Sequence, residues 1–430
     1  MTAPLRVGLA GLGTVGVGVV RMLQAHGAEI AARAGRAIEI VAVSARDRAR
    51  DRGVDLSGYR WVDDPIALAG DPEIDVVVEL IGGADGPALL LATTALNNGR
   101  SVVTANKAML AEQGDTLAHI AEAKGAALAY EAAVAGGIPI VKALREGLAG
   151  NRIERIYGIL NGTCNYILTT MRESGRSFDD VLAEAQQLGY AEADPGFDVD
   201  GIDAAHKLSI LASIAFGSEI DFAGVHIEGI RHVSPVDIAF AEELNYRIKL
   251  IGSARRTALG IEQRVHPCMI PLAAPIAHVE GVFNAVVAQG DFVQDSIYTG
   301  RGAGQGPTAS AVLADLIDLA AGRRAPTFGT PAASLSPARR APMDRHVGAY
   351  YVRLTVRDRP GVIAAVSAIL RDAEISMEAI IQRGRDPESI VPVVMTTHET
   401  EEAAMRMALA QIDALSAMAE PARMIRIETL

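Results

Sequence analysis

The chain has 430 residues, which is too long for one hydrophobic core, so two or three domains are expected. The hydrophobic share of 50% and the charged share of 21% are typical of a globular protein, whereas the formal net charge of −12 argues against non-specific nucleic-acid binding. The two cysteines cannot form a disulfide framework, the start does not resemble a secretion signal, and no uncharged apolar run reaches the ~18 residues of a membrane helix. We therefore expect a soluble, cytoplasmic protein without nucleic-acid or membrane partners.

The first predicted element is a short buried strand over residues 5–10, followed at once by a glycine-rich loop and a helix over residues 17–26. The loop has the pattern GxGxxG and consists of Gly11, Leu12, Gly13, Thr14, Val15 and Gly16. Between a strand and a helix, such a loop permits a tight turn and brings helix N–H groups close to a pyrophosphate. The pattern predicts a dinucleotide-binding loop, and a glycine-rich turn of an unrelated α/β protein is the alternative.

The second strand, residues 38–43, is followed by Ser44, Ala45 and Arg46. An NAD-selective site usually carries a carboxylate near the end of this strand, where it binds the ribose hydroxyl groups. Arg46 instead suits the 2′-phosphate of NADP. We expect NADP to be favoured and NAD to be tolerated, unless Arg46 is a solvated loop residue.

Strands over residues 75–80 and 101–104, with a helical segment over 86–99 between them, continue the alternation to about residue 130. This order predicts a doubly wound parallel sheet of the Rossmann type. Ligands bind such sheets beyond the carboxyl ends of the strands. Lys107 follows one of these ends, so it can meet a cofactor or a substrate; a surface lysine is the alternative.

A turn rich in small residues follows, from Glu131 to Pro139, before a helix over residues 140–146. Backbone carbonyls left free in this turn, together with the Glu131 carboxylate, would suit a hard monovalent cation by the oxygen preference of such ions. Taken alone the signal is weak, because an ordinary domain crossover has the same composition.

From residue 153 the pattern changes to mixed α+β, which we expect to extend over residues 137–300. A strand over 153–159 leads into Asn161-Gly162-Thr163-Cys164-Asn165-Tyr166 and a helix, then a second helix over 178–188. Further strands are expected over residues 248–254, 261–265 and 283–288. Cys164 is a candidate nucleophile, but no linear feature pairs it with a base, and free cysteine is most often a small buried hydrophobe.

The stretch 189–207 is acidic and opens an apolar, helix-like segment. Asp203 and Lys207 stand four residues apart, so on a helix they share one face. A carboxylate and an amine held together beside further carboxylates suit a small, polar, cationic substrate. The spacing does not match a calcium-binding EF-hand loop, and a solvated acidic loop remains the alternative.

A second glycine-rich loop, residues 299–308, precedes an apolar helix over 309–320, and either ligand contact or a flexible hinge explains it. Residues 323–349 have the composition of a linker. Residues 350–430 then follow the order βαββαβ of a ferredoxin-like sandwich, without a catalytic cluster, so a regulatory or associative role is expected.

Four motifs in this order resemble homoserine dehydrogenase: the first glycine loop, Thr104-Ala105-Asn106-Lys107, the segment from Asn161 to Leu168, and the acidic stretch. The C-terminal part resembles an ACT domain. The resemblance covers the whole chain and implies NAD(P)-dependent interconversion of L-aspartate 4-semialdehyde and L-homoserine, in threonine, methionine and isoleucine biosynthesis. A catalytically silent amino-acid sensor and another semialdehyde reductase are the alternatives.

The resemblance also implies roles for single residues. Lys207 would donate the proton to the aldehyde oxygen, and Lys107 would lie between cofactor and substrate. Gly189, Glu192 and Asp203 would bind the substrate, with Asp194, Asp198 and Asp200 solvated or supporting, and Gly304 would touch the cofactor. Glu131 and the carbonyls of Val134, Gly136 and Ile138 would form a sodium site.

The expected domains are a cofactor domain over residues 1–136, completed by about 301–322, a substrate and dimerisation domain over 137–300, a linker over 323–349, and an ACT domain over 350–430. The resemblance implies feedback control by threonine. It further implies a homodimer through the middle domain, or a homotetramer where ACT domains pair.

Overall fold

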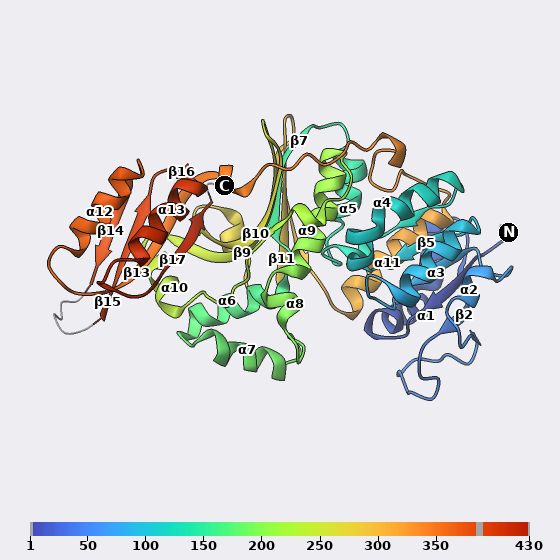
Figure 1. The fold of residues 1–430 in the computed structure, drawn as a ribbon. Coiled ribbons are helices and arrows are strands. Elements are labelled where there is room, and N and C mark those ends of the chain that lie inside the picture. Colours follow the sequence, from blue (N-terminus) through green and yellow to red (C-terminus); the bar gives the residue numbers. More distant parts are fainter. Residues whose placement is uncertain (1–2, 384–389, 429–430) are drawn as a thin grey trace.

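The computed structural model describes residues 3–383 and 390–428 and consists of three parts in a row (Figure 1). A parallel sheet with helices on both faces lies at one end, a mixed sheet lies in the middle, and a smaller sandwich lies at the other end. The predicted fold class is therefore confirmed. Within the described residues, no helix is long and apolar enough to cross a membrane.

The first sheet is parallel, with the strand order β3-β2-β1-β4-β5-β6. Helices α1 and α11 pack on one face, and α2, α3 and α4 pack on the other. The strand order reverses between β1 and β4, which is where such sheets bind dinucleotides. The elements are β1 (Leu5–Ala10), α1 (Thr14–Ala34), β2 (Ile38–Ser44), β3 (Arg60–Trp61), α2 (Ala67–Gly70), β4 (Val76–Glu79), α3 (Gly86–Asn97), β5 (Ser101–Thr104), α4 (Lys107–Ala123), β6 (Leu128–Ala129), η1 (Glu131–Ala133) and, from later in the chain, α11 (Gln305–Ala320).

The middle sheet is antiparallel along the order β12-β11-β7-β9-β10. Helix α9 lies across it in contact with β7, β9 and β10, and it also contacts α4 of the first part. The elements are α5 (Ile140–Lys142), η2 (Ala143–Gly147), β7 (Ile153–Ile159), α6 (Gly162–Ser174), α7 (Phe178–Gln187), α8 (Gly196–Val199), α9 (Ile202–Phe216), η3 (Phe222–Gly224), β8 (His226–Ile227), α10 (Pro235–Glu243), β9 (Tyr246–Thr257), β10 (Gly260–Pro271), η4 (Pro275–His278), β11 (Phe283–Gly290) and β12 (Gln294–Arg301).

The last part has the predicted βαββαβ order, with its strands arranged β17-β13-β15-β14. The preceding linker contains two short 3-10 turns, and it packs on the other parts: Phe328 is fully buried and its ring lies 5.7 Å from that of Tyr130. The elements are η5 (Ala332–Ser334), η6 (Met343–Arg345), β13 (Val347–Arg357), α12 (Val362–Asp372), β14 (Met377–Gln382), β15 (Ile390–Thr397), β16 (Thr400–Glu401), α13 (Glu402–Asp413) and β17 (Met418–Ile427).

Some elements differ from the sequence predictions. Helix α1 starts three residues earlier than predicted and runs eight residues further, and β9 and β10 are twelve residues long. Helix α10 was not predicted, because its apolar residues do not gather on one face. A Ser234–Asp237 capping box and Pro235 in the first turn start this helix.

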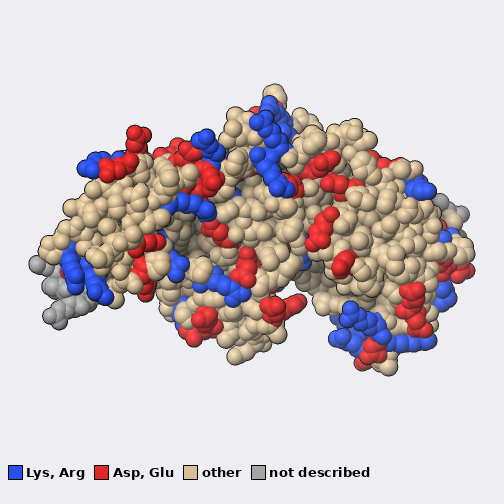
Figure 2. Space-filling view, in the orientation of Figure 1, with Lys and Arg blue, Asp and Glu red and all other residues tan. Residues whose placement is uncertain are grey.

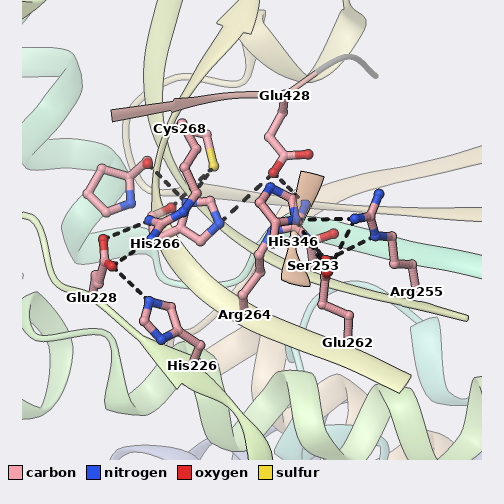
Figure 3. Close-up of polar contacts among 12 residues, drawn as sticks. His226, Glu228, Ser253, Arg255, Glu262, Arg264, His266, Cys268, His346 and Glu428 are labelled. Carbon is pink, nitrogen blue, oxygen red and sulfur yellow. Dashed lines mark hydrogen bonds and ion pairs between the residues drawn. The ribbon is translucent and has the colours of Figure 1, made fainter. Parts of the chain in front are cut away.

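The middle and C-terminal sheets are continuous, because β17 pairs with β10 in parallel at Cys268↔Arg426 and Met269↔Ile427. Beside this pairing lies a group of buried charges (Figure 3). Glu428 Oε1 accepts a hydrogen bond from Arg264 at 2.6 Å, and its Oε2 accepts one from Arg155 of β7 at 2.6 Å. Burial opposes its ionisation, but the charges of Arg264 and Arg155 hold the pKa of Glu428 well below its usual range.

The same group contains nitrogen, sulfur and oxygen atoms of His266, Cys268 and Glu428 within 4.8 Å of one another. A metal ion is disfavoured there, because Glu428 is already paired with two guanidinium groups and burial raises the pKa of the Cys268 thiol. The group is better explained as an interdomain ion network. Arg426 extends it by bonding Glu228 at 2.9 Å and Glu402 at 2.9 Å.

The network predicts acid sensitivity. Burial and the nearby Arg264 lower the pKa of His346 to about 3, and burial lowers that of His266 well below its usual value. The unfolded chain therefore binds protons that the folded chain excludes, and stability falls as the pH drops below about 6.5. At pH 5.5 each histidine should cost about 1.4 kcal/mol relative to pH 8.

The measurement is the thermal unfolding midpoint between pH 8 and pH 5.5. His346→Gln should reduce the acid-induced drop, whereas His26→Gln, at an exposed position, serves as the control and should leave it unchanged. An equal drop in the wild type and His346→Gln would contradict the assignment.

Candidate active site

The centre of the site is the buried carboxylate of Asp203, which holds two lysines from different parts of the fold. Its Oδ2 accepts a hydrogen bond from Lys207 Nζ at 2.7 Å, and its Oδ1 lies 3.2 Å from Lys107 Nζ. Lys207 Nζ also donates to the carbonyl of Leu160 at 2.8 Å. The structure therefore brings together three of the predicted site residues.

Local structure explains these positions. Gly201 adopts a φ of +87° and begins α9, which places Asp203 in its first turn and Lys207 one turn later. Lys107 is the first residue of α4, whose N-terminus is capped by Asn106: the side-chain oxygen accepts from Met109 N at 3.1 Å, and the amide donates to the Gly83 carbonyl at 2.7 Å. Lys107 thus lies at the carboxyl edge of the parallel sheet.

The charges of the site are strongly coupled. Burial disfavours ionised Asp203, but the positive charges of Lys207 and Lys107 outweigh it and hold the Asp203 pKa well below its usual range. Asn161 Nδ2 donates to Asp203 and to Asp198, at 2.8 Å in each case. Burial, followed by the charge of Asp203, raises the Asp198 pKa. The site thus combines one firmly ionised carboxylate, that of Asp203, with one more easily protonated carboxyl, that of Asp198.

The side chains of the acidic stretch, residues 189–207, lie in different environments. The Glu192 side chain is exposed and makes no hydrogen bond or ion pair with the described residues, so its predicted contact with substrate stays a prediction. Gly189 lies in the exposed turn after α7 with a φ of +74°. Asp200 pairs with Arg231, with Oδ2 3.0 Å from Nη2, and Asp194 accepts from Gly196 N at 3.2 Å.

The first glycine loop has the geometry of a cofactor site. A Cβ on Gly16 would lie 2.0 Å from the Gly11 carbonyl oxygen, which is why the turn from β1 into α1 tolerates no side chain there. A Cβ on Gly13 would meet no described atom within 4 Å, so the backbone is open to a ligand at this point. The loop consists of Gly11, Leu12, Gly13, Thr14, Val15 and Gly16.

The second glycine loop meets the first. Helix α11 begins after Gly304, which has a φ of +118° and no side-chain cap, and it packs against α1, where Gly18 lies close to Gln305 and Ala309. The N-termini of α1 and α11 are therefore neighbours. The second glycine loop therefore lies beside the first.

A cavity of about 450 Å³ lies beside the first glycine loop and is lined by Gly13, Arg46, Arg50 and Arg52, among others. Arg52 is held by the carbonyls of Leu12, Arg50 and Asp47, whereas Arg46 makes no hydrogen bond or ion pair with the described residues. Figure 2 shows Lys and Arg side chains gathered over the segment after β2, beside a hollow that faces α8.

Only some of the predicted cation ligands in the turn from Glu131 to Pro139 are free of other hydrogen bonds. Glu131 is buried, and its two carboxylate oxygens accept from Val141 N and Lys142 N, each at 2.9 Å. Burial and the neighbouring Asp315 raise the Glu131 pKa to about 7. Among the described residues, no backbone hydrogen bond reaches the carbonyls of Val134 and Gly136, whereas that of Ile138 accepts from Ile140 N at 2.8 Å. The donor set is therefore compatible with a cation that would favour ionised Glu131.

Sequence reasoning missed two amides. Asn161 begins the motif Asn161-Gly162-Thr163-Cys164-Asn165-Tyr166, but only its hydrogen bonds show that it links Asp198 and Asp203. Asn284 of β11 is 1% exposed, and its amide has no hydrogen-bond partner among the described residues. It lies between Gly302 and Gly162, where a Cβ would come within 2.2 and 3.5 Å of its side chain. A lone asparagine in an apolar strand gives no linear signal of such a position.

Cys164, the alternative nucleophile, does not fit that role. It is fully buried, and burial raises its thiol pKa well above the usual value, with the nearby Asp198 charge acting in the same direction. Its Sγ donates to the Asp198 carbonyl at 3.2 Å. A thiol in this state is a packing residue rather than a nucleophile.

Comparison with known families assigns all three parts. Residues 11–131 match the NAD binding domain of homoserine dehydrogenase, residues 139–317 match the homoserine dehydrogenase family, and residues 350–414 match the ACT domain. The ACT match confirms the βαββαβ assignment.

Relatives of full length agree. The chain is 48% identical to the homoserine dehydrogenase of Pseudomonas aeruginosa and 46% identical to that of Neisseria gonorrhoeae, with 99% of each chain covered in both cases. It superposes on a homoserine dehydrogenase structure from Thiobacillus denitrificans with a TM-score of 0.94 at 48% identity, covering 99% of this chain and 98% of that one. A hyperthermophilic archaeal homoserine dehydrogenase in complex with NADPH matches with a TM-score of 0.63 at 27% identity, over 74% and 97% of the two chains.

The site predicts a strong effect of Asp203→Asn. Without the carboxylate, two ammonium groups face each other and Lys207 loses its orientation, so kcat/KM should fall by about 10²-fold or more, as small misplacements of reacting groups do. Asp200→Asn, which removes an exposed partner of Arg231, is the control and should stay near normal. Steady-state turnover and cofactor affinity should be measured together, and unchanged turnover of Asp203→Asn would contradict this arrangement.

Proposed function

The chain belongs to the homoserine dehydrogenase family and is an NAD(P)-dependent oxidoreductase acting on CH–OH, and from this we propose that it reduces L-aspartate 4-semialdehyde to L-homoserine, reversibly, at Asp203. The observation that carries the proposal is the shared carboxylate, since it sets two amines from different parts of the fold at the edge of the sheet where the glycine loops lie. We place this reaction in threonine, methionine and isoleucine biosynthesis.

The bound nicotinamide cofactor, held by the glycine loops and Gly304, would supply or accept the hydride. In the direction of reduction, the carbonyl carbon gains the hydride and Lys207 Nζ gives its proton to the oxygen. Asp203 and the Leu160 carbonyl orient that amine. Lys107, whose side chain is 32% exposed and whose Nζ lies 5.5 Å from the centre of the Phe197 ring, is suited to polarise the oxygen from the cofactor side.

We propose that the substrate's ammonium group is bound by the carboxylates of the acidic stretch. Asp203 and Asp198 already share the Asn161 amide, and Glu192, exposed beside the turn at Gly189, would close over the substrate. The cofactor part would comprise residues 1–136 and 301–322, the substrate part 137–300, and the regulatory part 350–430, with 323–349 as the linker.

Lys207→Ala tests the mechanism. The variant should bind cofactor normally but lose turnover by about 10²–10⁴-fold, the usual contribution of a general acid. Pre-steady-state absorbance of the nicotinamide and a cofactor titration separate the two effects. Turnover close to that of the wild type would remove Lys207 from the role of proton donor.

We propose that NADP is favoured over NAD through Arg46, which lines the cavity beside the glycine loop. Arg46→Ala should raise KM for NADPH by at least tenfold and leave KM for NADH nearly unchanged, because only NADPH carries the 2′-phosphate. Arg48→Ala is a matched control, since Arg48 lies over the Trp61 ring at 5.9 Å. Equal losses for both cofactors would contradict the 2′-phosphate role.

We propose that a sodium ion binds Glu131 and the carbonyls of Val134, Gly136 and Ile138. The ion would neutralise Glu131 and stiffen the turn, whose Gly136 and Gly137 N–H groups hold the carbonyls of Gly302 and Arg301 at 2.9 Å. Binding would thereby steady the second glycine loop.

Replacing choline chloride by NaCl at constant ionic strength should therefore raise the unfolding temperature of the wild type but not that of Glu131→Gln, because an ion that binds only the folded state stabilises it. Glu146→Gln, with an exposed carboxylate, should behave like the wild type. An identical sodium response in Glu131→Gln would place the ion elsewhere.

We further propose feedback by L-threonine through the ACT domain, to be tested by titrating threonine into the steady-state assay. A homodimer through the edge strand β12 is supported by exposed apolar side chains at and beside it, among them Ile297 and Phe292, and pairing of ACT domains would give a homotetramer. Light scattering after size-exclusion chromatography distinguishes a monomer from both.

A further inference from the structure

Asn284 is a buried amide in an apolar strand, and the proposed mechanism gives it no role. It is the second residue of β11, it is 1% exposed, and the four residues that follow it are buried alanines and valines. Neither the oxygen nor the nitrogen of its amide has a hydrogen-bond partner among the described residues. Because an unpaired buried amide destabilises a fold, such a group in an apolar strand points to a role outside packing.

Asn284 lies between the loop before α11 and the segment that begins α6. A Cβ on Gly302 would come 2.3 Å from both amide atoms, and a Cβ on Gly162 would lie 3.5 Å from Oδ1. Gly302 stands two residues before Gly304, the N-cap of α11, whereas Gly162 directly follows Asn161 of the active site. The amide is therefore placed between the second glycine loop and a segment of the catalytic machinery.

The neighbouring loop has unpaired donors of its own. The backbone N–H groups of Gly302 and Ala303 make no hydrogen bond within the part of the chain that the structure describes. The carbonyl oxygens of the same two peptide groups accept from Gly137 N and Gly136 N, each at 2.9 Å. Because the C=O and N–H of a trans peptide point in opposite directions, both N–H groups point away from that turn. An unused acceptor and two unused donors thus lie next to one another at Gly302.

We propose that Asn284 positions the second glycine loop for the cofactor: when the loop closes on a bound nicotinamide dinucleotide, the N–H of Gly302 or Ala303 donates to Asn284 Oδ1. Gly304, with a φ of +118°, gives the loop the backbone freedom to turn. The bond forms in only one arrangement of the loop, so it favours that arrangement and adds to cofactor affinity. The inference rests on the proposed cofactor contact of Gly304, and Asn284 itself does not touch the cofactor.

Strand β11 also connects this position to the catalytic amine. Ala285 pairs with Ile159 of β7, so one step further along the two strands Asn284 is level with Leu160. The carbonyl of Leu160 accepts from Lys207 Nζ at 2.8 Å. Closure of the loop on Asn284 therefore brings the cofactor toward the end of the strand that orients the proton donor. Since this bond does not involve the 2′-phosphate, it serves NADH and NADPH equally.

The test removes the amide in the full chain. Asn284→Leu and Asn284→Ala should weaken the binding of NADPH and of NADH about five- to tenfold, the value of one hydrogen bond, in calorimetric titrations. KM for both cofactors should rise by the same factor, with a smaller effect on kcat. The unfolding temperature of Asn284→Leu should equal or exceed that of the wild type, because the variant loses an unpaired buried amide.

Asn165→Leu is the matched control for stability. Asn165 is also 1% exposed, but its amide is fully paired. Its Nδ2 donates to the carbonyls of Val279 and Gly281 at 3.0 and 2.9 Å, and its Oδ1 accepts from Lys249 Nζ at 3.1 Å. This variant should lower the unfolding temperature, because it leaves those partners without their hydrogen bonds.

The results separate the possible roles. Weaker binding of both cofactors without a loss of stability in Asn284→Leu supports the positioning role. Wild-type cofactor affinity in both Asn284 variants overturns it and leaves the proposed reaction intact. A drop in unfolding temperature equal to that of Asn165→Leu also overturns it, since the amide would then have a partner in the present fold. If Asn284→Leu does not fold, the cofactor affinity of Asn284→Ala decides in the same way. If the wild type binds neither cofactor, the proposed function and this role both fall.

Discussion

A single buried carboxylate, that of Asp203, organises this molecule. Its oxygens lie within hydrogen-bonding distance of Lys207 Nζ and 3.2 Å from Lys107 Nζ. The two lysines come from helices α9 and α4, which pack on different sheets. Removing the charges of Asp203 and Lys207 from water is costly, and the cost is offset only where geometry and additional hydrogen bonds satisfy each group. Asn161 and the Leu160 carbonyl provide those bonds. The contact of α4 with α9 therefore decides whether the site exists.

The second constraint is the continuity of the middle and C-terminal sheets. Parallel pairing of β10 with β17 would leave the two parts free to slip, because few residues pair there. The buried charges fix the register: Arg264 and Arg155 meet Glu428, and Arg426 meets Glu228 and Glu402. Buried ion pairs add little net stability but strongly penalise any arrangement that separates them. The C-terminal part is thus held in one position relative to the strand that precedes the catalytic loop.

Local sequence signals predicted the elements well where a boundary residue or a run of β-branched residues marked them. Strands β5 and β7 have the predicted bounds, and the glycine loops lie where their helices begin. Helix α10 was missed for lack of an apolar face, and the buried position of Asn284 has no sequence signature. Local sequence signals also could not predict which carboxylates of the acidic stretch are buried, since Asp198 and exposed Glu192 have similar neighbours in the chain.

By itself the sequence determined the alternation of elements, the glycine loops that need a backbone without side chains, and the Asp203–Lys207 spacing, because these depend on residues a few positions apart. The tertiary structure alone decided that Lys107 reaches the same carboxylate, that Cys164 is sealed in the core, and that Glu428 reaches Arg155. These contacts join residues that are far apart in the chain, and only packing of the sheets brings them within hydrogen-bonding distance.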